Sequence, residues 1–130
     1  MALKKIVHVD DDEDIRIIVQ IAIETVGQME LVQYADGPSA LAGIAETKPD
    51  LFLFDVMMPG MTGLELRREI AKLPGFDHVP TVYVTAKAED SFTNQLRAEG
   101  ALAVITKPFD PMTLADDLRV VWQDRHAACV

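Results

Sequence analysis

Four short, largely apolar runs in this sequence each end beside a polar or charged residue, and this repeated pattern most constrains the fold. The runs and the residues that follow them are 5–9 before Asp10, 51–54 before Asp55, 82–84 before Thr85, and 104–106 before Lys107. Runs of this length are typical of strands covered on both faces, as in a parallel sheet. Because parallel strands end at the same edge of a sheet, we expect these four polar residues to lie close together.

The segments between these runs carry apolar residues at helical spacing. The expected stripes are Ile15, Ile18, Val19, Ala22 and Val26 before Gly27; Ala40, Leu41, Ile44 and Ala45; Leu66, Ile70 and Leu73; Phe92 and Leu96; and Leu114, Leu118, Val121 and Trp122. Residues 31–35 predict another strand, Asp36–Gly37 predicts a turn, and Asp110–Pro111 predicts the start of the last helix. The sequence therefore predicts an α/β fold of the doubly wound, flavodoxin-like type. By analogy with that type, its five parallel strands are expected in the order 2-1-3-4-5, with five helices.

The length of 130 residues fits one domain. We expect that domain to span residues 1–124 and residues 125–130 to form a short tail, with no output domain after it. The composition, 49% hydrophobic and 25% charged residues, is that of a globular protein with a real core.

The chain carries 12 basic and 21 acidic residues, a net charge of -9, and no cluster of lysine and arginine. Because binding to DNA phosphates needs such a cluster, no direct DNA binding is expected. No run approaches the about 18 apolar residues of a membrane span, and the first residues lack a secretory signal. The lone Cys129 argues against a disulfide-stapled secreted protein, so we predict a cytoplasmic location.

Three aspartates, Asp10, Asp11 and Asp55, are the candidate metal ligands. Mg²⁺ prefers oxygen ligands, and a cation relieves the repulsion between clustered carboxylates. The three histidines lack the spacing of a zinc site, and His8 is expected to be a packed strand residue. We therefore predict a Mg²⁺ site at the carboxyl edge of the sheet.

Asp55 is also the candidate nucleophile, because a carboxylate is ionised near neutral pH and needs no general base. Phosphoryl transfer depends on positioning and charge neutralisation more than on covalent activation. The ammonium of Lys107 would pair with one phosphoryl oxygen, and the Thr85 hydroxyl would donate to another. The small Ala86 would leave room for the group.

Each residue has a plainer interpretation when it is taken alone. An aspartate-rich run before a helix commonly caps that helix, and this is the role we expect for Asp12. Thr85 alone is an ordinary strand-end hydroxyl, and Lys107 alone is an ordinary surface lysine before a proline. Together the plain interpretations fail, because chance would have to place every one of these residues at the carboxyl end of a strand.

At these residues the chain resembles the receiver domain of two-component response regulators, in particular stand-alone, chemotaxis-type receivers. The resemblance covers residues 4–123, and the segments that carry it are 6–12, 55–63, 84–86 and 107–109. It implies a signalling switch that accepts a phosphoryl group from a sensor histidine kinase or a histidine phosphotransfer protein. Its only chemistry would be phosphoryl transfer to itself and slow self-dephosphorylation. Such a switch acts through contacts with a downstream protein, as a monomer or transient dimer.

The resemblance also implies roles for individual residues, with Asp55 as the phosphoacceptor. The implied Mg²⁺ ligands are Asp10, Asp11, Asp55 and the backbone carbonyl of Met57. The implied phosphoryl-binding residues are Thr85, Ala86 and Lys107, and the implied cis peptide joins Lys107 to Pro108.

One position departs from the family pattern. Many receivers carry an aromatic residue three positions before the lysine, and its rotation is coupled to the threonine hydroxyl. Here that position is Val104, whose small, branched side chain is stiff about χ1. Thr85 and Val104 are therefore the expected readout residues, but a swinging ring cannot be the readout.

Three other functions remain as alternatives. A Mg²⁺-dependent phosphohydrolase with an aspartate nucleophile usually carries a second aspartate two residues on, where this chain has Met57. A flavodoxin-like FMN carrier would place its phosphate against residues 10–12, which are all acidic. A degenerate receiver that only binds partners would not need the full set of site residues.

Overall fold

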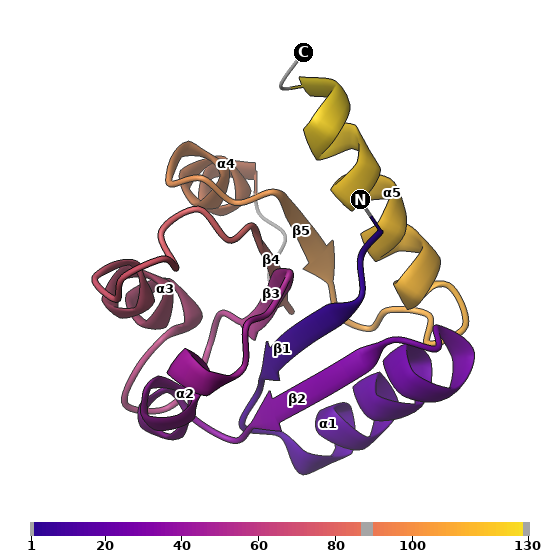
Figure 1. Cartoon of the computed structure of the whole chain (residues 1–130), viewed down its shortest axis with the longest axis horizontal. Helices are drawn as coiled ribbons and strands as arrows, with labels where there is room; N and C mark the ends of the chain where they lie inside the picture. The colour runs from indigo at the N-terminus through magenta and orange to yellow at the C-terminus, as the bar shows by residue number, and fades with distance from the viewer. Residues whose placement is uncertain (1, 87–89, 129–130) are drawn as a thin grey trace.

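Five parallel strands form one sheet in the order β2-β1-β3-β4-β5 (Figure 1). The computed structural model describes residues 2–86 and 90–128, and the strands belong to that part of the chain. They are β1 (Lys5–Val9), β2 (Glu30–Tyr34), β3 (Leu51–Asp55), β4 (Thr81–Thr85) and β5 (Ala103–Thr106). The predicted doubly wound sheet and its strand order are thus confirmed.

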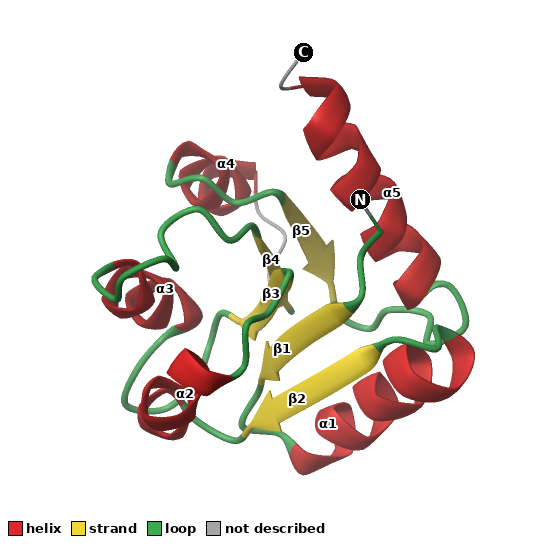
Figure 2. Ribbon diagram, viewed as in Figure 1, coloured by secondary structure: helices red, strands yellow, loops and turns green. Residues whose placement is uncertain are grey.

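Helices cover both faces of this sheet (Figure 2). The helical segments are α1 (Glu13–Gln20) with the π-helical turn η1 (Ile21–Val26), α2 (Gly37–Gly43) with the 3₁₀ turn η2 (Ile44–Glu46), α3 (Gly63–Ala71), α4 (Asp90–Ala98) and α5 (Leu114–Ala128). Figure 1 shows α1 and α5 on one face and α2, α3 and α4 on the other. Such placement follows from right-handed crossovers between parallel strands whose order reverses beside β1.

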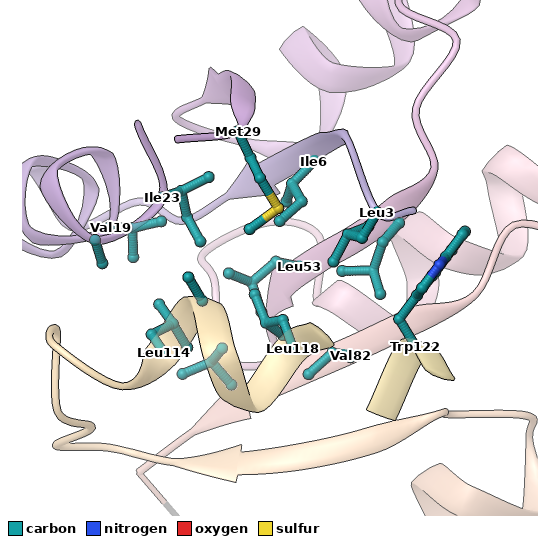
Figure 3. Close-up of a cluster of buried hydrophobic side chains, with 14 of the residues drawn as sticks. Leu3, Ile6, Val19, Ile23, Met29, Leu53, Val82, Leu114, Leu118 and Trp122 are labelled. Carbon is teal, nitrogen blue, oxygen red and sulfur yellow. The ribbon is translucent and has the colours of Figure 1, made fainter. Parts of the chain in front are cut away.

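The sheet separates two hydrophobic cores because successive strand residues point to opposite faces. In β3, Leu53 packs with Leu118 and Trp122 of α5 on one face, where α1 also lies (Figure 3). Phe52 and Phe54 pack on the other face with the residues of α2 and α3, and their rings stack 5.0 Å apart. All five residues of β3 are buried, as expected for a central parallel strand.

The end of the first helix differs from the expected stripe. Val26 is 37% exposed, whereas Ile23 is fully buried against α5. The cause is η1, in which Gly27 N donates to Ala22 O across five residues. This wider turn adds a residue to the helix and so moves the buried face from position 26 to position 23. Gly27 ends the helical segment, as predicted.

Three other helix boundaries also differ from expectation. Asp36 caps α2 by accepting from Ser39 N at 2.7 Å, so Asp36–Gly37 starts a helix and is not a separate turn. Asp110 accepts from Met112 N in a turn, and α5 begins four residues later at Leu114. The helix then runs to Ala128, past the predicted limit at residue 124.

Some sequence expectations fall outside what is described. The side chain of Phe92 and residue Cys129 lie beyond the described positions. Among the residues that are described, no helix is long and apolar enough to cross a membrane.

Candidate functional site

The carboxyl ends of β1 and β3 bring three carboxylates together. Val9 pairs with Phe54 in register, so Asp10 and Asp55 follow side by side. One carboxylate oxygen from each of Asp10, Asp11 and Asp55 lies within 4.8 Å of the others. Three hard anionic oxygens at this spacing fit a small divalent cation such as Mg²⁺.

Burial makes this cluster costly without a counter-charge. Asp10 is fully buried and Asp55 is 4% exposed, whereas Asp11 is exposed. The pKa of Asp55 is raised to about 6, chiefly by burial and then by the charge of Asp10, against the opposing effect of Lys107. Asp55 is therefore mostly ionised at neutral pH and yet a stronger base than an ordinary aspartate.

Lys107 supplies the opposing charge from the end of β5. Its Nζ lies 3.1 Å from Asp10 Oδ2 and 3.3 Å from Asp55 Oδ1. Burial lowers the pKa of Lys107, but the carboxylates of Asp10 and Asp55 outweigh burial, and the pKa is raised overall. One ammonium thus contacts carboxylates at the ends of the neighbouring strands β1 and β3, although β4 lies between β3 and its own strand, β5.

The aspartates in the loop after β1 have different roles. Asp10 Oδ1 accepts from Asp12 N at 2.9 Å, which holds the Asp10 side chain at the site. Asp12 Oδ1 accepts from Asp14 N at 2.9 Å and from Ile15 N at 3.3 Å. The prediction that Asp12 caps the first helix is therefore confirmed.

Thr85 and Lys107 are held together by the sheet. Thr85 is fully buried at the end of β4, one residue beyond Val84, which pairs with Asp55. Lys107 N donates to Thr85 O at 2.8 Å, and the Lys107–Pro108 peptide is cis. Ala86, the next residue, is exposed.

The remaining predicted residues lie at the rim or on the opposite face. Met57, two residues past Asp55, has 57% of its surface exposed. Val104 pairs with Tyr83 on β4 and packs, half-buried, against the core on the α3 and α4 face. Its place on that face separates it from the carboxylate cluster.

Three residues near the cluster were not predicted as a group: His8, Arg16 and Gln33. Arg16 Nη1 donates to Asp10 O at 2.7 Å. Gln33 Nε2 donates to Arg16 O at 2.8 Å and lies 3.1 Å from His8 Nδ1. The available signal was strand alternation, because His8 lies two residues before Asp10 and so faces the same side. Nothing local in the sequence linked Gln33 to it.

Comparisons with known proteins agree on one family. Its sequence model, described as the response regulator receiver domain, matches residues 6–119. The phosphate regulon transcriptional regulatory protein PhoB of Pseudomonas aeruginosa is 37% identical over 121 residues, which are 93% of this chain and 52% of that protein. Response regulator PleD of Caulobacter vibrioides is 38% identical over 85% of this chain and 24% of its own length. The chain thus spans about half of PhoB and about a quarter of PleD.

Solved structures show the same likeness. The chemotaxis protein CheY4 of Vibrio cholerae has a TM-score of 0.84 and 32% identity, over 92% of this chain and 99% of that one. A CheY-like receiver domain protein from Methanospirillum hungatei has a TM-score of 0.82 and 28% identity, over 98% of this chain and 99% of that one.

Proposed function

The chain belongs to the response regulator receiver domain family of two-component signalling, and we propose that it is a switch phosphorylated on Asp55. The observation that carries this proposal is the position of Lys107 Nζ, within 3.3 Å of a buried carboxylate on each of two strands. A cation between two acidic groups at a sheet edge suits a site that must accept more negative charge. The donor would be a phosphohistidine on a sensor kinase or a histidine phosphotransfer protein.

The transfer needs one nucleophile and no separate base. A carboxylate oxygen of Asp55 forms a bond to phosphorus, the phosphorus–nitrogen bond of the donor breaks, and its electron pair returns to the donor imidazole. Although burial raises the pKa of Asp55 to about 6, that value is still below neutral pH, so the carboxylate is mostly ionised and nucleophilic there. The product is an acyl phosphate on Asp55.

Charge neutralisation would come from the residues around Asp55. The carboxylates of Asp10, Asp11 and Asp55, with the Met57 carbonyl, would hold Mg²⁺, which when bound offsets phosphoryl charge. Lys107 would move its contact from the Asp55 carboxylate to a phosphoryl oxygen. The Thr85 hydroxyl would donate to another such oxygen beside the exposed Ala86.

The readout would use the face that carries Thr85 and Val104. Thr85 ends β4, and Val104 lies beside β4 on β5, packed against the core on the α3 and α4 face. A shift of the Thr85 hydroxyl toward the phosphoryl group would repack this face without a ring rotation, because Val104 has no ring. The repacked face would then bind a downstream protein.

The test is incubation with Mg²⁺ and acetyl phosphate, followed by intact mass measurement and by mapping of an acid-stable, base-labile adduct. The wild type is expected to gain one phosphoryl group, and Asp55→Asn is expected to gain none. The same assay with a chelator should give no adduct. An adduct that persists in Asp55→Asn would contradict the proposal. Fast turnover of acetyl phosphate would indicate a phosphohydrolase instead.

A further inference from the structure

The imidazole of His8 is buried beside the carboxylate cluster with one nitrogen unused. His8 is 1% exposed, and its Nε2 has no hydrogen-bond partner within the described part of the chain. The great majority of buried donors in proteins have a hydrogen-bond partner, since an unpaired one is destabilising. A strand position facing the core could carry a leucine or valine without this cost.

The neighbouring glutamine determines which nitrogen of His8 carries the proton. Gln33 Nε2 lies 2.8 Å from Arg16 O, and a carbonyl oxygen only accepts, so this atom is the amide nitrogen. Its second hydrogen is available to His8 Nδ1 at 3.1 Å, which must then accept. A neutral imidazole that accepts at Nδ1 carries its hydrogen on Nε2. The unused atom is therefore a donor.

This donor is turned toward a candidate metal ligand. His8 Nε2 lies 4.0 Å from Asp10 Oδ2, which is too long for a hydrogen bond but the nearest carboxylate to it. The same oxygen accepts from Lys107 Nζ at 3.1 Å. A small rotation of the Asp10 carboxylate, as it takes its position for a cation, would bring Oδ2 within hydrogen-bond distance of His8 Nε2.

We propose that His8 is a positioning residue for Asp10: its Nε2–H, set by Gln33, donates to the Asp10 carboxylate and orients that carboxylate for a divalent cation. The inference rests on the proposed function, because Asp10 needs this orientation only if it binds Mg²⁺. Hydrogen-bond partners of metal ligands typically change metal affinity about 10–100-fold when they are removed. The role is thus measurable as an affinity.

Two substitutions of His8 separate the donor from the packing. His8→Leu fills similar space without a donor, whereas His8→Gln keeps an amide N–H near the position of Nε2. Leu53→Val is the control for lost packing, because Leu53 lies beside His8 in register and is fully buried. The measurements are the Mg²⁺ dissociation constant by calorimetry and the Mg²⁺ concentration for half-maximal phosphorylation by acetyl phosphate.

His8→Leu is expected to raise both values about tenfold, with phosphorylation restored at saturating Mg²⁺. His8→Gln should stay within about threefold of wild type, and Leu53→Val should lower the melting temperature without changing the Mg²⁺ affinity. The inference is overturned if His8→Leu binds Mg²⁺ like wild type, or if His8→Gln is as weak as His8→Leu. In either case normal phosphorylation of the wild type would leave the proposed function intact. A wild type that neither binds Mg²⁺ nor becomes phosphorylated would contradict both the His8 inference and the proposed function.

Discussion

The candidate site holds buried carboxylates next to a lysine, before any cation or phosphoryl group is bound. Asp55 is almost fully buried beside Asp10, and one lysine faces both carboxylates. Burial and Asp10 raise the pKa of Asp55 to about 6, which means that its ionised form is disfavoured in the folded protein. Stability is thus given up at the residue that is proposed to react.

Asp55→Asn is expected to stabilise the metal-free protein by about 2 kcal/mol at pH 8. The folded pKa of Asp55 is raised, so the wild type loses stability as pH rises from the unfolded value of 3.8 through about 6. The gain from the variant should therefore vanish near pH 4. Urea unfolding with a chelator at both pH values measures it.

The matched control for that variant is Asp12→Asn, which removes the same charge from a capping position where asparagine serves equally well. Its unfolding free energy should stay near that of wild type at pH 8. If Asp55→Asn is no more stable than Asp12→Asn, burial of the Asp55 charge does not destabilise the folded protein.

His8 has the opposite effect on pH dependence. Burial, with the charges of Lys107 and Arg16, lowers the pKa of His8 to about 3 from 6.5. Its stabilising contribution is complete above pH 6.5 and is lost as pH falls toward 3, because only the unfolded chain takes up the proton. Relative to pH 7.5, we expect the wild type to lose about 2 kcal/mol more than His8→Gln at pH 5. Equal losses of unfolding free energy in urea at the two pH values would contradict this.

At the scale of elements, the first turn of α3 packs against the end of β3, and Gly63 N donates to Val56 O at 3.0 Å. Thr62 Oγ1 accepts from Glu65 N, and Glu65 Oε1 accepts from Thr62 N, both at 3.1 Å, which forms a capping box. Gly63 follows, and a Cβ there would lie 2.3 Å from the carbonyl oxygen of Asp55. The first turn of the helix can therefore touch the backbone of Asp55, the proposed phosphoacceptor, only because residue 63 is glycine.

Gly63→Ala should therefore displace Asp55 as well as destabilise the fold. We expect a loss of about 2 kcal/mol in unfolding free energy and a slower phosphorylation by acetyl phosphate at saturating Mg²⁺. Thr62→Ala is the control, since it removes the cap at a cost of about 1 kcal/mol without placing an atom against Asp55. A phosphorylation rate in Gly63→Ala equal to that in Thr62→Ala would show that this contact does not position Asp55.

At the scale of the whole molecule, folding itself assembles the candidate cation site. Asp10 and Asp55 are 45 residues apart in the sequence and become neighbours only when β1 pairs with β3. The unfolded chain does not hold these carboxylates together, so a cation that binds the folded site stabilises it by mass action. The net charge of -9 adds repulsion that the same cation reduces.

Mg²⁺ at about 100 times its dissociation constant should add about 2.7 kcal/mol to stability. For a domain of this size the melting temperature should rise by about 5–10 °C. Thermal unfolding followed by circular dichroism measures the shift, with KCl at equal ionic strength as the control. A chelator should reverse the shift, and the double variant Asp10→Asn, Asp55→Asn should lack it. An equal shift with KCl would mean that screening alone is responsible.

Much of this protein could be predicted from local patterns. The apolar run at residues 51–54 predicts a buried strand. The end of such a strand is an unusual position for an ionisable residue such as Asp55, because burying a charge is costly. Asp12 caps α1 through hydrogen bonds within three residues, so sequence spacing alone is enough to foresee it. Gly27 ends its helical segment for a similarly local reason.

Other features depend on contacts that the local pattern does not contain. The wide turn η1 moves burial from Val26 to Ile23, because packing against α5 decides which residue faces the core. The pKa values of Asp55 and His8 follow from burial and from charges brought close by strand pairing. The burial of Ile23 and both pKa values therefore depend on contacts with residues that are distant in sequence.

By itself, the sequence determined the alternation of strands and helices and the polar residue at each strand end, because period and capping act over a few residues. The tertiary structure decided that Lys107 reaches both Asp10 and Asp55, and that Gln33 sets the proton of His8 from 25 residues away. The distances between side chains on different strands depend on the register of the strands. That register is set by the packing of whole faces of the sheet.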